Sequence, residues 1–128
     1  MPINDIANAG VTLTAVKGCL VATLHADLHD QAFEQIRNAT LDKVVGTGAI
    51  SVIFDMSAVR LLDCHEYAKL GQLLEMLRLL GCRTMLVGIS AGVVAYLVSQ
   101  DVDIRHIHAE RGLEEAFDRL IPRRLQGA

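Results

Sequence analysis

The segment that decides the fold is residues 54–66, which read Phe-Asp-Met-Ser-Ala-Val-Arg-Leu-Leu-Asp-Cys-His-Glu. The apolar run at residues 49–54 predicts a buried central strand, followed directly by Asp55. Asp63 and, three residues later, Glu66 fit a capping box, in which two side chains satisfy the first backbone N–H groups of a helix. The segment therefore predicts a strand, a short loop and a helix that begins at the carboxyl end of a sheet.

Cys64 falls in the first turn of this predicted helix, next to His65. Backbone N–H groups without partners and the positive end of the helix dipole meet at such a position. A negative charge is favourable there, so the position suits a phosphate or a thiolate.

Working outward, the periodicity of apolar residues predicts an α/β domain. Two short β runs, at 11–16 and 19–24, are joined by a Gly-containing link and predict a hairpin. The other predicted elements are a helix from Asp27 to a stop at Gly46, the strand 49–54, a helix over 63–80, a strand over 84–88, a helix over 91–98, a strand over 104–108 and a helix over 112–121. The order β-β-α-β-α-β-α-β-α indicates a mixed, mostly parallel sheet opened by a hairpin, with about four helices.

We expect the 128 residues to form a single domain over 1–128, with its core at about 11–121. In the helix over 63–80, an apolar stripe at helical spacing predicts core packing against the sheet rather than a partner groove. The stripe consists of Tyr67, Leu70, Leu74, Leu77 and Leu80. Glu66 and Lys69 lie off the stripe and are better candidates for an interface.

The composition argues against several classes of function. A hydrophobic content of 52% is enough to form a core without disulfide or metal cross-links. A net charge of −3 does not provide the basic face that binding of nucleic acid requires. Three cysteines without CxxC spacing disfavour a disulfide framework or a zinc site and favour a reducing compartment. No apolar run has the length of a membrane span and no signal-peptide pattern opens the sequence, so we expect no membrane insertion and a cytoplasmic location.

No motif for a cofactor, a metal or catalysis is evident. Gly46-Thr-Gly48 precedes a strand instead of following one, which disfavours a dinucleotide-binding turn, and no P-loop is present. His25 and His29 are four residues apart but have no third ligand. His106 and His108 would share one face of a strand and are expected to face solvent. We therefore expect no cofactor, no metal and no catalytic residue.

The central segment resembles the signature of the STAS family, the sulfate-transporter and anti-sigma-factor-antagonist domains. In that signature a strand ends in Asp, a Ser/Thr-x-Val loop follows, and a helix opens with Asp and a hydroxyl residue that a partner serine/threonine kinase phosphorylates. The matching residues are Asp55, Ser57, Val59, Asp63 and Cys64. The resemblance runs from about Val11 to Leu120.

Two further stretches, 26–30 and 81–89, are similar to the RsbS-type subgroup, the single-domain scaffold subunit of bacterial stressosomes. Two positions depart from the family pattern. Cys64 stands at the phosphoacceptor position, where a serine kinase is not expected to modify a thiol, and Ala91 stands where relatives often have Pro.

The resemblance implies a STAS-like fold and a non-enzymatic regulatory module that binds protein. Its expected partner is a GHKL-type serine kinase acting as an anti-sigma factor, or other STAS proteins, with a homo-oligomer as a further option. The interface that it implies consists of Asp27, Asp30, Asp55, Ser57, Asp63, Cys64, His65, Glu66 and Ser90.

Three interpretations of Cys64 stay open. In the first, Cys64 is a near-isostere of Ser and the phosphorylation switch is absent. In the second, Cys64 is a redox sensor, and the helix start together with a protonated His65 makes its thiol more reactive. In the third, phosphorylation has moved to another residue, namely Ser57, Ser90 or Thr84. Two other functions stay open as well. One is a nucleotide or small-molecule sensor or transporter accessory, and the other is a thiol enzyme that uses Cys64 with His65.

Overall fold

The computed structural model describes residues 6–8, 10–25, 28–105 and 107–121. Its strands form one sheet in the order β1-β2-β3-β4-β5-β6. β1 (Ile6–Asn8), β2 (Val11–Val16) and β3 (Cys19–Leu24) are antiparallel. β3, β4 (Ser51–Asp55), β5 (Arg83–Val87) and β6 (Ala109–Glu110) are parallel. The predicted α/β fold with a hairpin ahead of a parallel sheet is confirmed, although β1 was not predicted.

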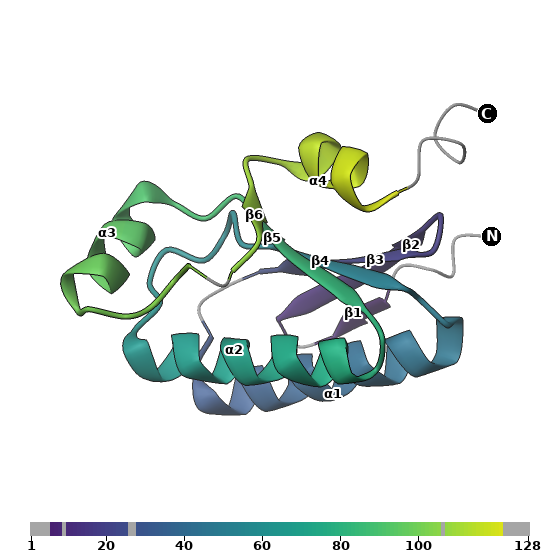
Figure 1. Cartoon of the computed structure of the whole chain (residues 1–128). Coiled ribbons are helices and arrows are strands. Elements are labelled where there is room, and N and C mark those ends of the chain that lie inside the picture. Colours follow the sequence, from purple (N-terminus) through teal and green to yellow (C-terminus); the bar gives the residue numbers. More distant parts are fainter. Residues whose placement is uncertain (1–5, 9, 26–27, 106, 122–128) are drawn as a thin grey trace.

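The helices form two layers around the sheet (Figure 1). α1 (Asp30–Thr47) and α2 (Cys64–Leu79) cover one face, and α4 (Leu113–Leu120) lies over the other. α3 (Ala91–Ser99) lies beside the end of the sheet at which α2 begins. We call this end, where β4 and β5 finish, the carboxyl end, and the end at which they start the amino end.

The main core lies between the sheet and the pair α1 and α2. Of the predicted α2 stripe, Tyr67, Leu70, Leu74 and Leu77 are buried, as predicted. The prediction for Leu80 was wrong, because α2 ends at Leu79 and Leu80 is its C-cap, 53% exposed. A smaller cluster lies under α4 and joins Cys19, Ile53, Met85, Val87, Ala116 and Leu120.

The predicted ends of the first helix were wrong. His29, not Asp27, is the N-cap of α1, and its Nδ1 accepts a hydrogen bond from the backbone N–H of Ala32 at 3.5 Å. Asp27 itself lies outside the described residues. The helix continues past Gly46 because Gly48 provides the left-handed conformation (φ 68°) that the C-cap adopts.

The predicted strand over 104–108 was also wrong, since only Ala109–Glu110 pair with β5. A turn takes its place: the backbone N–H of Ile107 donates to the carbonyl of Ile104 at 3.2 Å. His108 still contributes one carbonyl, which accepts from the N–H of Leu86 at 2.9 Å. His106 lies outside the described residues.

Candidate functional site

The loop after β4 is organised by its acidic residue. Asp55 Oδ1 accepts hydrogen bonds from the backbone N–H of Ser57 at 3.0 Å and from the Ser57 hydroxyl at 2.6 Å. The N–H of Val59 then donates to the carbonyl of Met56 at 2.9 Å, and both of these side chains are buried. Asp55 and Ser57, which were predicted as interface residues, therefore fix the shape of this loop through their own hydrogen bonds.

Gly88 completes the loop and was not predicted to take part in it. Its φ is 72°, and a β-carbon at this position would collide with Ser57 Oγ and lie 3.4 Å from Asp55 Oδ1. Only glycine fits here without strain. The available signal was a glycine placed directly after a buried strand.

The start of α2 carries the predicted capping box. Asp63 Oδ1 accepts from the N–H of Glu66 at 2.7 Å, and Glu66 Oε1 accepts from the N–H of Asp63 at 2.9 Å. Cys64 is the first residue of the helix and is a half-buried free thiol. The fixed backbone around Cys64 makes this helix start a rigid feature of the surface.

A cluster of one acidic and two basic side chains connects the starts of α1 and α2. Asp30 Oδ1 lies 2.7 Å from Lys69 Nζ and 3.2 Å from His65 Nε2. The hydrogen bond and the charge of Lys69, and then those of His65, hold the pKa of Asp30 below its ordinary value. The predicted site residues Asp30 and His65 thus meet, and the His65 ring is engaged by a carboxylate on another helix, which gives no support to a thiol enzyme that pairs it with Cys64.

Ser90 lies in the loop after β5 and is the N-cap of α3. Its Oγ accepts from the N–H of Val93 at 3.1 Å. The carboxyl end therefore presents every predicted interface residue that the structure describes, namely Asp30, Asp55, Ser57, Asp63, Cys64, His65, Glu66 and Ser90.

An exposed apolar surface lies beside these residues and was not predicted. We call it the α3 surface; it consists of Leu61 and Tyr96, which are 69% and 44% exposed and line the same groove, whereas the exposed Val94 and Val98 lie on another side of α3. A groove of about 390 Å³ passes between this surface and the start of α2, and Leu61, Asp63, Glu66 and Tyr96 are among its lining residues. The sequence signal was an α3 segment that is apolar on all sides although it is too short to be enclosed.

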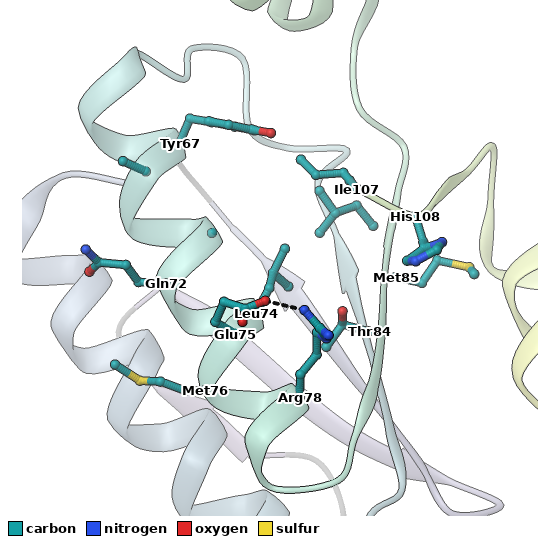
Figure 2. Close-up of a pocket in the computed structure, with 13 residues that line it drawn as sticks. Tyr67, Gln72, Leu74, Glu75, Met76, Arg78, Thr84, Met85, Ile107 and His108 are labelled. Carbon is teal, nitrogen blue, oxygen red and sulfur yellow. Dashed lines mark hydrogen bonds and ion pairs between the residues drawn. The ribbon is translucent and has the colours of Figure 1, made fainter. Parts of the chain in front are cut away.

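A second hollow lies between α2 and β5 (Figure 2). This groove of about 980 Å³ is lined by apolar side chains such as Leu74 and Ile107, with Tyr67 at one end. Arg78 and Glu75 form an ion pair on its α2 wall, 2.5 Å between Nη1 and Oε2. The groove exists because β6 pairs only with Leu86 and Val87. None of the predicted site residues lines it.

The other two cysteines differ from Cys64 in their surroundings. Cys19 is buried under α4, and Cys82 is buried at the amino end, where its Sγ donates to the carbonyl of Ala49 at 3.3 Å. Burial raises the pKa of both thiols, and in Cys19 a hydrogen bond with Ser51 offsets this in part. Cys19 and Cys82 are therefore part of the packed core.

The fold and the site define a small α/β domain with a capped helix start and exposed apolar side chains at the carboxyl end of its sheet. The family model of the STAS domain matches residues 11–116, and the chain belongs to this family. No curated protein sequence matches the chain.

Among solved structures, the chain is similar to RsbS of Moorella thermoacetica, with 23% identity, a TM-score of 0.74 and coverage of 92% of this chain and 98% of that one. A structure of the stressosome, described as a signal integration and transduction hub, matches with 24% identity, a TM-score of 0.71 and coverage of 91% and 99%. The unphosphorylated anti-sigma factor antagonist SpoIIAA matches with 22% identity, a TM-score of 0.63 and coverage of 92% and 99%. These likenesses confirm the STAS-like fold.

Within the part of the chain that the structure describes, no helix has both the length and the apolar character needed to cross a membrane.

Proposed function

We propose that this STAS protein is a non-enzymatic, cytoplasmic regulator that binds a GHKL-type serine kinase or anti-sigma factor, or other STAS proteins, through its carboxyl end. The observation that carries this proposal is the α3 surface beside Cys64. Exposed apolar side chains next to charged ones, here Leu61 and Tyr96 next to Asp63 and Glu66, are the composition expected of a protein interaction site. The expected contacts are Leu61 and Tyr96 at the centre, with Asp63 and Glu66 at the rim.

The surroundings of Cys64 favour the interpretation that the usual switch is missing. A thiol stands at the helix position where a kinase would act on a hydroxyl. Of the alternative acceptors, the Ser57 hydroxyl donates to Asp55 and the Ser90 hydroxyl caps α3. A phosphate on Ser57 would lie against the Asp55 carboxylate and be repelled by it. Thr84 is half-buried and lines the groove between α2 and β5 instead of the carboxyl end. We propose that partner binding at this surface is not controlled by phosphorylation of Cys64.

The test uses a purified GHKL-type serine kinase from the same organism, ATP and intact mass spectrometry after calorimetric titration. The wild-type protein should bind the kinase and gain no phosphate, whereas Cys64→Ser should bind and gain one phosphate. Tyr96→Ala should weaken binding at least about tenfold, as expected for a central aromatic contact. Ala68→Ser, an exposed change on α2 outside the α3 surface, is the matched control.

Absence of a complex with the wild-type protein would overturn the proposed partner class. Binding that is unaffected by Tyr96→Ala would overturn the α3 surface as the docking site. Phosphate on the wild-type protein would show that the acceptor has moved to a hydroxyl residue.

The groove between α2 and β5 supports a second candidate function, that of a ligand sensor. Its volume of about 980 Å³ lies at the upper end of the range for small-molecule sites. A thermal shift with a nucleotide that Thr84→Arg abolishes would favour this candidate.

A further inference from the structure

Three neighbouring hollows follow β5 from the amino end of the sheet to α3. The groove between α2 and β5, of about 980 Å³, shares the lining residues Arg78 and His108 with a hollow of about 470 Å³ at the amino end. It shares Tyr67 and Ile107 with an apolar cavity of about 120 Å³ beneath α3. Figure 2 shows Tyr67 and Ile107 at one end of the groove and Arg78 toward the other. Because the hollows share these walls, we call the three together the β5 trough.

The amino end of the β5 trough is basic. Its lining residues include Arg78, Arg83 and Arg119, together with His108, and within the described part of the chain no acidic residue lines it. The three arginines come from α2, β5 and α4. The fold thus brings cations from three elements to one hollow, and a hollow lined by one sign of charge favours a ligand group of the opposite sign.

Arg83 is the cation best placed to receive such a group. Arg78 pairs with Glu75, and Arg119 pairs with Glu110 at 2.6 Å between Nε and Oε2. Both arginines are largely exposed, and ion pairs at exposed positions are weak, so an incoming anion can share these two guanidinium groups. Arg83 is exposed and forms no ion pair with any residue that the structure describes.

The opposite end of the β5 trough is apolar. The cavity beneath α3 is lined by buried side chains such as Met56, Val93 and Leu97, and of the described residues none that carries a charge lines it. Tyr67 stands where the groove meets this cavity, and its hydroxyl donates to the backbone carbonyl of Asp103 at 3.0 Å. A cavity with such walls offers water no hydrogen-bond partners and therefore favours an apolar group.

Two small residues of α2, Ala68 and Gly71, line the middle of the β5 trough. A β-carbon on Gly71 would have no atom within 4 Å, so no close contact in the fold requires glycine there. Glycine inside a helix also makes the helix less stable than alanine would. The benefit of Gly71 is therefore the space that it leaves on the α2 wall between the basic and the apolar end.

We propose that the β5 trough binds a single-chain amphiphile with an anionic head, namely a fatty acid. The carboxylate binds Arg83 and the two neighbouring arginines, the hydrocarbon chain passes Gly71, and the end of the chain lies beneath α3. This inference rests on the second candidate function, that of a ligand sensor, and assigns the class of its ligand.

The two ends of the trough favour an amphiphile over other ligands. A small inorganic anion would use the basic end and leave the apolar groove and cavity empty. A nucleotide would also match the basic end, but its base and sugar would place polar groups against apolar walls without hydrogen-bond partners, which is unfavourable. A hydrocarbon chain with a carboxylate at one end matches both parts.

Calorimetric titration of the full chain with laurate, below its micelle concentration, tests the inference. Dodecyltrimethylammonium carries the same chain with a cationic head, and acetate carries the head without the chain. Laurate should bind at least about tenfold more tightly than either compound, because it alone satisfies both ends of the trough.

Two variants locate the site. Gly71→Leu fills the middle of the trough and should fold, since leucine is a better helix former than glycine and the space is open. Arg83→Gln removes the cation that receives the carboxylate. Each should weaken laurate binding at least about tenfold. Gly46→Leu, at an α1 glycine that also has open space, and Arg111→Gln, at an exposed arginine outside the trough, are the matched controls and should bind laurate like the wild-type protein.

The direction of the ligand has its own readout. Stearate with a nitroxide near the end of its chain should broaden the backbone amide signal of Leu97 in α3 more strongly than that of Arg83. A nitroxide next to the carboxylate should have the opposite effect. Equal broadening of both signals by both labels would overturn the proposed orientation.

A wild-type protein that does not bind laurate would overturn the inference, as would laurate binding that Gly71→Leu leaves unchanged. Binding to anionic phospholipid vesicles without binding of laurate would assign the basic end to a membrane surface and also overturn it. Titration with ADP separates the two proposals: ADP binding that Gly71→Leu abolishes, without laurate binding, would overturn the fatty acid and keep the ligand sensor. Kinase binding uses the α3 surface, so Gly71→Leu should still bind the kinase.

Discussion

A single oxygen of Asp55 holds both the backbone N–H and the hydroxyl of Ser57, at 3.0 and 2.6 Å. These two hydrogen bonds place the Ser57 hydroxyl over Gly88, which follows the neighbouring strand β5. The hydroxyl occupies the space that a β-carbon at position 88 would need. The loop before Cys64 is thus fixed by three residues from two strand ends. A docking surface whose loop is fixed before binding loses less conformational entropy when a partner arrives.

The close contact between Ser57 and Gly88 predicts a large cost for Gly88→Ala. A positive φ alone costs about 1 to 2 kcal/mol for alanine, and the collision with Ser57 adds roughly 1 to 3 kcal/mol. Gly48→Ala is the matched control, because Gly48 has a similar φ of 68° and open space around it. Urea denaturation should show a clearly larger loss of unfolding free energy for Gly88→Ala, and Ser57→Ala should recover part of it. Equal losses in the two variants would contradict this account.

The capping box gives a second prediction, for the helix start that carries Cys64. Asp63→Ala should lower the free energy of unfolding by about 1 kcal/mol, because the N–H of Glu66 loses its acceptor. Asp63→Asn keeps an oxygen in place and should cost less. Chemical denaturation of both variants measures the difference. A similar loss for Asn and Ala would mean that charge at the dipole, not the hydrogen bond, stabilises this end.

Local patterns explain why most of the fold could be predicted. The capping box at Asp63 and Glu66, and the apolar stripe from Tyr67 to Leu77, are set by neighbours three or four residues away. Ile104 and Ile107 were mistaken for strand residues because β-branched side chains resemble an edge strand. The backbone there turns instead, with hydrogen bonds from Ile107 N–H to Ile104 and from Arg105 N–H to Asp103 Oδ1.

The parts of the site that could not be predicted depend on contacts distant in sequence. The meeting of Asp30 with His65 and Lys69 requires α1 and α2 to lie side by side. The exposure of Tyr96 depends on how little of α3 the core covers, and Leu61 is exposed in the loop between β4 and α2. Hydrophobic composition alone does not distinguish a buried residue from a docking residue.

The environments of the three thiols predict their order of reaction with an alkylating agent. Cys64 is half-buried, whereas Cys19 and Cys82 are buried and burial raises the pKa of both. The thiolate is the reactive form, so the native protein near pH 8 should be alkylated first at Cys64, by at least about tenfold in rate. Peptide mapping of timed samples measures this. In Cys64→Ser the fast phase should vanish, and a fast phase that remained would place the reactive thiol at Cys19 or Cys82.

The cluster of Asp30, Lys69 and His65 predicts a dependence on pH whose direction follows from the lowered pKa of Asp30. A carboxyl whose pKa is lowered in the folded state stabilises the fold fully at pH values above its ordinary pKa of 3.8. That contribution is lost as the pH falls through the lowered pKa of the folded state. Asp30→Asn should therefore be less stable than the wild-type protein at neutral pH, and the difference should shrink in acid.

Carbon-detected NMR titration of the Asp30 carboxyl tests the cause. Lys69→Met should raise the pKa of Asp30 toward 3.8, and His65→Gln should raise it less, because Lys69 is the larger cause. Lys43→Met removes a cation from another part of α1 and should leave the Asp30 titration unchanged. An Asp30 pKa that is insensitive to Lys69→Met would show that the ion pair between α1 and α2 does not persist in solution.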